Sequence, residues 1–224
     1  LEAVDEDDAP GRRRRRGKQK GVVAPRPDET RRPGGETAAA VGLALAWGYS
    51  APPFRFKRNG WIGNGVVGLS YETLPWITAA TAALGATPSR LTMLVALLYG
   101  LGAHGILTLN DFKAIKGDRQ MGVNTLPVLH GAANAARIAC LVMAASQGGV
   151  ILLLANAGLS TGAALVATVL ALQLICMIRF LRDPEGKAVW YSAVGVGLYV
   201  SGMMAAAVAA WNRAGPRWRC WHRR

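Results

Sequence analysis

Two carboxylates and three cations gather in one short polar stretch of a largely apolar chain, LTLNDFKAIKGDRQMGVNTLPVLHG, residues 107–131. Asp111 and Asp118 are seven residues apart, about two helical turns, so this spacing predicts that both project from one face of a helix. Mg²⁺ is usually held beside phosphates by one or two carboxylates and water, and cations can contact phosphate directly. The stretch therefore predicts a magnesium and phosphate site, with Lys113, Lys116 and Arg119 as its cations. The alternative is a solvated loop whose basic residues only set the membrane topology.

The elements that position this stretch are expected to be membrane helices. The chain has 224 residues, of which 51% are hydrophobic and 17% are charged. Residues 138–178 contain no Lys, Arg, Asp or Glu, and a bilayer core needs about 20 apolar residues per helix, so this run predicts two spans. The turn between them is expected at Asn156-Ala157-Gly158.

Further spans are predicted at 37–54, 63–86, 91–109 and 188–212. Lipid offers no partner to an unpaired backbone amide, so each is expected to be helical. The fold class is therefore all-α, a multi-span transmembrane helix bundle. Its abundant Gly and Ala would allow close helix packing.

Basic residues are concentrated in the loops that follow the first, third and fifth spans. Cytoplasmic loops carry an excess of Lys and Arg, so the polar stretch is expected to face the cytoplasm. A second polar cluster, YSAPPFRFKRNGWIGN at residues 49–64, is predicted on the same side. Its cations would face the two carboxylates across the bundle, an arrangement that suits a metal–diphosphate ligand. The alternative for this cluster is again a basic loop that sets the topology.

The two ends of the chain differ from its middle. Residues 1–36 combine an acidic patch with five consecutive arginines, Arg12 to Arg16, a composition that predicts a disordered segment. The alternative for this segment is that it is not native to the protein. We expect no nucleic-acid partner. Residues 37–212 form the expected membrane domain, and residues 213–224 form a basic tail. The alternation of the spans places this tail on the side opposite to the other basic loops, which the positive-inside rule does not explain.

Three further polar residues are candidates for a role. His104 precedes Asp111 by seven residues and is either near a bound substrate or a hydrogen-bonded packing residue. Glu72 is the one charged residue of its predicted span, and an acid within a membrane usually has a role or a partner. His130 is expected on the loop surface.

Three segments together resemble the chlorophyll and bacteriochlorophyll synthases of the UbiA family of membrane prenyltransferases: WGYSAPPFRFKRNGWIGN, SYETLPW and LTLNDFKAIKGDRQMGVNTLPV. The resemblance runs from about Val41 to Trp211, and GDRQMGV is closer to the bacteriochlorophyll branch. It implies a bundle of nine spans, of which this chain is expected to lack the first three, and two aspartate-rich motifs that hold Mg²⁺ and a prenyl diphosphate.

The resemblance also assigns residues. Asp111 and Asp118 belong to the second aspartate motif as catalytic, metal-holding residues, and Asn110 begins that motif. The substrate-binding residues would be Tyr49, Lys57, Arg58, Asn110, Lys113 and Arg119. The first aspartate motif is not found before Val41, so a truncated, inactive copy of such an enzyme is an alternative. Lys116 stands where relatives typically have an acidic residue, which makes this site more cationic.

The implied reaction joins the propionate of bacteriochlorophyllide a to a geranylgeranyl or phytyl group, with Mg²⁺ as cofactor, in an inner or intracytoplasmic photosynthetic membrane. The expected partners are the two substrates, membrane lipid and other proteins of pigment synthesis or assembly. Two alternatives stay open. One is a non-catalytic membrane protein that binds pigment or assists its assembly, and the other is a UbiA-type prenyltransferase with a different aromatic acceptor.

Overall fold

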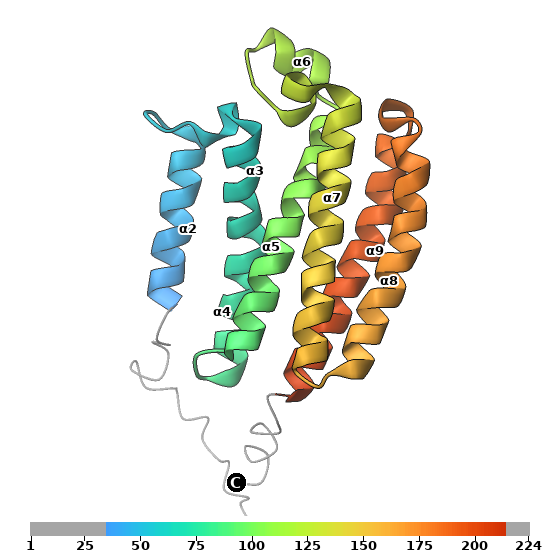
Figure 1. Cartoon of the computed structure of the whole chain (residues 1–224). Helices are drawn as coiled ribbons and strands as arrows, with labels where there is room; N and C mark the ends of the chain where they lie inside the picture. Colours follow the sequence, from blue (N-terminus) through green and yellow to red (C-terminus); the bar gives the residue numbers. More distant parts are fainter. Residues whose placement is uncertain (1–34, 214–224) are drawn as a thin grey trace, which may run out of the picture. The chain divides into compact units, whose positions relative to one another are not determined.

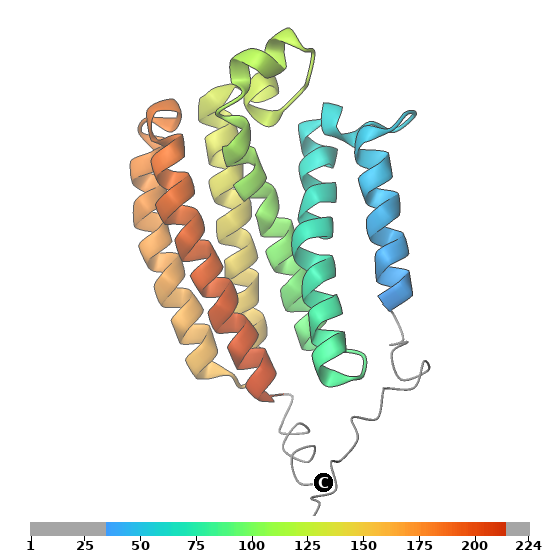
Figure 2. The same ribbon diagram turned by 180° about the vertical axis from the view of Figure 1, so that it is seen from behind.

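The computed structural model describes residues 35–213, and this part of the chain is helical without any β-strand. The expectations for residues 1–34 and 214–224 lie outside the described residues. The α-helices of the described part are α2 (Gly35–Ser50), α3 (Gly60–Gly68), α4 (Leu74–Leu84), α5 (Arg90–Asp111), α6 (Ile115–Gln120), α7 (Leu126–Asn156), α8 (Ser160–Leu181) and α9 (Pro184–Arg213). Figures 1 and 2 show the long helices running side by side.

Four helices of the described part, α5, α7, α8 and α9, are long and apolar enough to cross a membrane. Two of the predicted spans differ from these. Helix α2 has only 16 residues. The predicted span 63–86 consists of α3, a π-helical segment Leu69–Thr73 and α4, which follow one another without a break. Pro75 lacks the N–H that would bond to the carbonyl of Tyr71, which explains why the regular helix is interrupted here.

The ends of these helices follow local sequence signals. The hydroxyl of Ser89 accepts a hydrogen bond from the backbone N–H of Thr92 at 3.2 Å and caps α5. Helix α4 ends at Leu84 and is capped by Gly85, which has a positive φ of 64°. The predicted turn between α7 and α8 is confirmed, because α7 ends at Asn156 and Gly158 has a φ of 75°.

The core lies between α5, α7, α8 and α9, where α5 packs mainly on α7 and α8 packs mainly on α9. A Cβ atom on Gly105 would lie 2.6 Å from the carbonyl oxygen of Ala139, so only glycine allows this approach of α5 to α7. Buried polar side chains join the other helices. Gln147 of α7 donates a hydrogen bond to Gln173 of α8, which in turn donates to the hydroxyl of Tyr191 on α9 at 3.3 Å.

The connectors alternate between the two ends of the bundle. Residues 51–59, the α6 region and the short α8–α9 connector lie at one end, which is the upper end in Figure 1. The α4–α5 and α7–α8 turns lie at the other end. The two polar clusters of the sequence therefore share one end of the bundle, as predicted. Which side of the membrane this end faces stays a prediction.

Candidate functional site

The predicted single helical face for the two carboxylates is wrong. Helix α5 ends at Asp111, a turn follows, and Asp118 belongs to the separate helix α6. The turn forms because the backbone N–H groups of Lys113 and Ala114 bond three residues back, to Asn110 and Asp111, where an α-helix would bond four residues back. The two carboxylates nevertheless lie at the same cavity, because the turn folds α6 over the end of α5.

Asp111 and Asp118 line one cavity of about 630 Å³. The opposite wall is supplied by the segment around residues 49–64, which brings Tyr49 at the end of α2 together with the exposed cations of the connector. The cavity-lining residues of this wall with polar side chains are Tyr49, Ser50, Arg55, Lys57, Arg58, Asn59 and Asn64. Cations and carboxylates that are far apart in the sequence therefore face the same space.

A backbone clamp holds the two walls together. The N–H of Gly60 donates to the carbonyl of Asn124 at 2.8 Å, and the N–H of Asn124 donates to the carbonyl of Arg58 at 3.1 Å. These bonds form an isolated parallel bridge between Asn59 and Asn124. The side chain of Asn59 also accepts from the N–H groups of Trp61 and Ile62, which caps α3 directly behind the basic connector.

Each carboxylate has a neutral hydrogen-bond donor. The amide of Asn64 lies 3.3 Å from Oδ2 of Asp111 and 3.3 Å from the hydroxyl of Thr108. Thr108 in turn donates to the carbonyl of His104 at 2.9 Å, which fixes its position. Asp118 accepts from the hydroxyl of Thr125 at 3.3 Å. These bonds orient both acids without neutralising them.

The cations of the cavity form no ion pairs with its acids in the part of the chain that the structure describes. The ion pair that the described residues contain joins Lys187 to Asp183, away from this cavity. Arg55, Lys57 and Arg58 are exposed and form no ion pair within residues 35–213, so their charge is available to an anion that enters the cavity.

The remaining predicted site residues lie on the end of α5, on α6 and on the turn between them, outside the cavity lining. Asn110, Lys113 and Arg119 are exposed, as is Lys116. The geometry brings in two residues that the sequence did not single out, Asn64 and Thr125. For Asn64 a signal was available, because it is an amide within the otherwise apolar segment GWIGNGVVG.

The donor set of the cavity fits a hard divalent cation. Two carboxylates and the amide oxygen of Asn64 are oxygen ligands of the type that Mg²⁺ takes, with phosphate and water completing its shell. The described residues contain no group of three or more His, Cys, Asp or Glu side chains that could enclose a metal by itself. The set therefore suits a metal that a phosphate ligand helps to hold.

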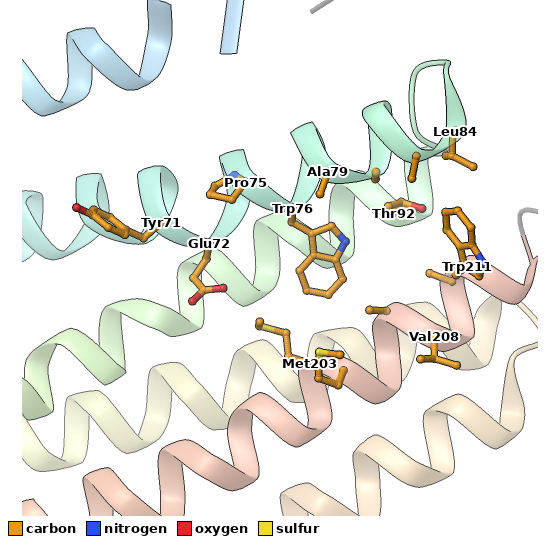
Figure 3. A pocket seen from close by; sticks show the side chains of 15 residues that line it. Tyr71, Glu72, Pro75, Trp76, Ala79, Leu84, Thr92, Met203, Val208 and Trp211 are labelled. Atoms are coloured by element: carbon orange, nitrogen blue, oxygen red, sulfur yellow. The ribbon is translucent and has the colours of Figure 1, made fainter. Parts of the chain in front are cut away.

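The other candidates lie elsewhere. Nε2 of His104 is 3.3 Å from the carbonyl of Trp61, and the two rings are 5.4 Å apart, so buried His104 packs behind the cavity wall and lines neither cavity. His130 is exposed, as predicted, but it belongs to helix α7 and not to a loop, and its Nε2 lies 3.4 Å from the indole nitrogen of Trp61. Glu72 lines a second, apolar cavity of about 570 Å³ between α4 and α9 (Figure 3).

Comparison with known proteins places this arrangement in a family. The sequence profile described as the UbiA prenyltransferase family matches residues 37–203, which is most of the described part. The chain belongs to the UbiA prenyltransferase family. Members of this family generally depend on a divalent metal, and together with the four span-length helices the membership makes this an integral membrane protein.

Several curated UbiA proteins are similar to this chain. The bacteriochlorophyll synthase 33 kDa chain of Cereibacter sphaeroides is 51% identical over 177 residues, which cover 79% of this chain and 59% of that protein. The bacteriochlorophyll synthase 34 kDa chain of Chloroflexus aurantiacus is 48% identical and is matched over 54% of its length. The chloroplastic chlorophyll synthase of Arabidopsis thaliana is 36% identical over 77% of this chain.

A solved structure supports the UbiA fold. It is described as "Structural and mechanistic insights into the biosynthesis of Digeranylgeranylglyceryl phosphate synthase in membranes" and aligns with a TM-score of 0.62 over 78% of this chain and 60% of that one, at 18% identity. The chain thus spans about three-fifths of the length of this structure and of the first bacteriochlorophyll synthase. The expected helical bundle of UbiA type is confirmed.

Proposed function

We propose that the protein transfers a geranylgeranyl or phytyl group from its diphosphate to the propionate of bacteriochlorophyllide a, in the presence of Mg²⁺. The observation that carries the proposal is the cavity of about 630 Å³ in which Arg55, Lys57 and Arg58 face Asp111 and Asp118. Similarity to bacteriochlorophyll synthases at 48–51% identity supports the choice of acceptor over another aromatic compound.

The cationic wall of the cavity binds the diphosphate. Guanidinium and ammonium groups form charge-assisted hydrogen bonds to phosphate oxygens, and Arg can do so with two parallel bonds. Tyr49 lines the same cavity and can donate its phenol O–H. Asn110, Lys113 and Arg119 belong to the segment that carries Asp111 and Asp118, on the other side of the cavity, and their contribution to diphosphate binding is part of the proposal.

Asp111 and Asp118 would hold Mg²⁺ against the diphosphate. When bound, Mg²⁺ supplies positive charge that stabilises the leaving diphosphate. The chain's own contribution is to orient the acids, through Asn64 and Thr125, and to add the charge of the connector cations. Since one wall carries acids and the other cations, the anion is directed to the space between them.

The reaction needs no general base. The propionate of the acceptor is ionised at neutral pH, so its oxygen can attack the first carbon of the prenyl chain directly. The new C–O ester bond forms as the C–O bond to the diphosphate breaks, and the electron pair leaves with the diphosphate. The cavity therefore accelerates the reaction by positioning the substrates and by stabilising the charge of the leaving group.

The proposed place of action is the inner or intracytoplasmic photosynthetic membrane, with the polar cavity on the cytoplasmic side. Two of the connectors that share this end of the bundle carry the basic clusters of the middle of the chain, in agreement with the positive-inside rule. Membrane lipid and other proteins of pigment synthesis or assembly are the further partners that this location implies.

The decisive experiment uses membranes that contain this chain, with bacteriochlorophyllide a, geranylgeranyl diphosphate and Mg²⁺, and follows esterified pigment by chromatography. The proposal predicts product that disappears with a metal chelator and with Asp111→Asn. Product that persists under both treatments would contradict the role of the cavity. Pigment binding without any product would instead favour the non-catalytic pigment-binding alternative.

A further inference from the structure

The cavity between α4 and α9 is mainly apolar, and Tyr71, Thr92 and one carboxylate supply its polar side chains. Trp76, Met203, Val208 and Trp211 are among its lining residues, and Glu72 contributes the single acid. Figure 3 shows the side chains of Glu72 and Trp76 pointing from one wall toward Met203 on the other. Its volume of about 570 Å³ lies in the range of sites that bind small molecules.

Glu72 has no hydrogen bond or ion pair with any residue of the described part of the chain. An acid at membrane depth is costly, and it normally has a partner or serves a function. It is also carried by the π-helical segment Leu69–Thr73, and such interruptions of a helix are frequent at functional sites. The carboxylate interacts electrostatically with the buried phenol of Tyr199 but forms no hydrogen bond with it, so a ligand could supply the missing partner.

The walls of the cavity favour a flat ligand. Trp76 is stacked on buried Tyr99, with ring centroids 5.7 Å apart and an interplanar angle of 15°. The stacking fixes the indole plane on the side of the cavity, so a planar apolar ligand meets a rigid aromatic surface. Such a ligand must also offer Glu72 a hydrogen-bond donor, a positive charge or a metal centre, because a neutral hydrocarbon would leave the carboxylate without a partner.

A magnesium-containing tetrapyrrole meets both demands, since it is a flat apolar ring with a hard cation at its centre. Carboxylate oxygen is a preferred ligand for Mg²⁺. We propose that Glu72 is an axial ligand to the magnesium of the acceptor pigment, and that the cavity between α4 and α9 holds the pigment ring. The identity of the pigment rests on the proposed function, but the assignment of Glu72 to a metal-centred planar ligand rests on the cavity itself.

The position of Glu72 is compatible with the reaction. Glu72 follows Asn64, which contacts Asp111, by eight positions. Glu72 and Asn64 are therefore roughly 12 Å apart along the axis of α3 and the π-helical segment. Tyr71 of the apolar cavity is close enough to Tyr49 of the polar cavity for an electrostatic interaction. A ring held at Glu72 can therefore direct its propionate side chain toward the polar cavity.

The test compares bacteriochlorophyllide a with bacteriopheophorbide a, the same ring without magnesium, by titration into the full chain in lipid nanodiscs. The wild type is expected to bind the magnesium pigment roughly tenfold more tightly. Glu72→Leu removes the carboxylate at similar volume, so it should abolish this preference while binding of the metal-free pigment persists. Glu72→His should keep the preference for the magnesium pigment, because imidazole also ligates magnesium. The visible absorption band that reports axial ligation should change in parallel.

The matched control is Glu185→Gln, an exposed acid in the first turn of α9 that contacts neither cavity, and it should leave both titrations unchanged. Equal affinity of the wild type for the two pigments, or a preference that Glu72→Leu retains, would overturn the proposal. The esterification assay is independent of these titrations. Selective pigment binding without esterification would support the role of Glu72 and contradict the proposed function. Esterification with no effect of Glu72→Leu on pigment binding would support the proposed function and contradict the role of Glu72.

Discussion

The side-chain amide of Asn64 lies 3.3 Å from Oδ2 of Asp111, although 47 residues separate them in the sequence. This bond joins α3 to the end of α5, and the same amide reaches Thr108 one turn earlier on α5. Asn64 thereby links the two walls of the polar cavity. It also determines which oxygen of Asp111 stays available to a metal or to water.

Replacement of Asn64 by Ala is expected to lower esterification about 10- to 100-fold, as is usual for residues that orient a metal ligand. The physical reason is that Asp111 loses the donor that holds its carboxylate toward the cavity. A misoriented Asp111 should bind Mg²⁺ more weakly, so the Mg²⁺ concentration at half-maximal rate should rise. The bundle itself is expected to remain folded. Asn134→Ala is the control, since Asn134 is exposed on α7 and lines neither cavity. An unchanged Mg²⁺ dependence in Asn64→Ala would refute the positioning role.

Asp111→Asn should reduce the rate of product formation by roughly 10²-fold or more, because the substitution removes one charge from the proposed metal site without changing its shape. Initial rates at saturating substrates are the measurement. Asp118→Asn is expected to act in the same direction. Glu185→Gln removes an exposed acid of α9 and should keep the wild-type rate. A comparable loss in that control would point to a general effect of charge.

Substitution of the connector cations should act on substrate binding. Lys57→Ala and Arg58→Ala are expected to raise the KM for prenyl diphosphate roughly 10-fold each, since a hydrogen bond to a charged group contributes about 1.5–3 kcal/mol. Lys187→Ala is the matched control, because Lys187 lies in the first turns of α9 and pairs with Asp183. If Lys187→Ala raised KM equally, the effect would reflect the overall charge at this end of the bundle.

The buried amides of Gln147 and Gln173 should stabilise the bundle through their mutual bond. Gln173→Met keeps the approximate volume but leaves the amide of Gln147 without its partner, so the free energy of unfolding should fall by about 1 kcal/mol. Unfolding in a denaturing detergent, followed by far-UV circular dichroism, measures it. The double variant with Gln147→Met should be less destabilised than the sum of the single variants. Full additivity would show that the two amides do not interact.

Gly105→Ala should destabilise the contact of α5 with α7 by about 1–3 kcal/mol, because the new methyl group would meet the backbone carbonyl of Ala139 at 2.6 Å. Gly148→Ala offers a matched control on α7. A Cβ there meets nothing within 4 Å, and alanine favours a helix over glycine by about 0.5–1 kcal/mol. The two substitutions should therefore shift the thermal unfolding midpoint in opposite directions, and shifts of the same sign would contradict the packing argument.

Much of the helical framework could be predicted from local patterns. The apolar run 138–178 and the turn at Gly158 predicted α7 and α8, and both were confirmed. The predicted continuity from Asp111 to Asp118 failed because hydrophobic periodicity says little about where a helix breaks after it leaves the apolar region. The π-helical segment was also missed, although Pro75 offered a signal in the sequence.

The sequence by itself determined that this is a membrane bundle with acids and cations at one end, because span length and charge depend only on the order of residues. The tertiary structure decided which of them share a cavity. Asn64, Thr125 and the bridge from Asn59 to Asn124 complete the polar cavity, while Glu72 faces the apolar one. A helix face that packs on protein and one that faces lipid are equally apolar, so only the packed arrangement of the helices could distinguish them.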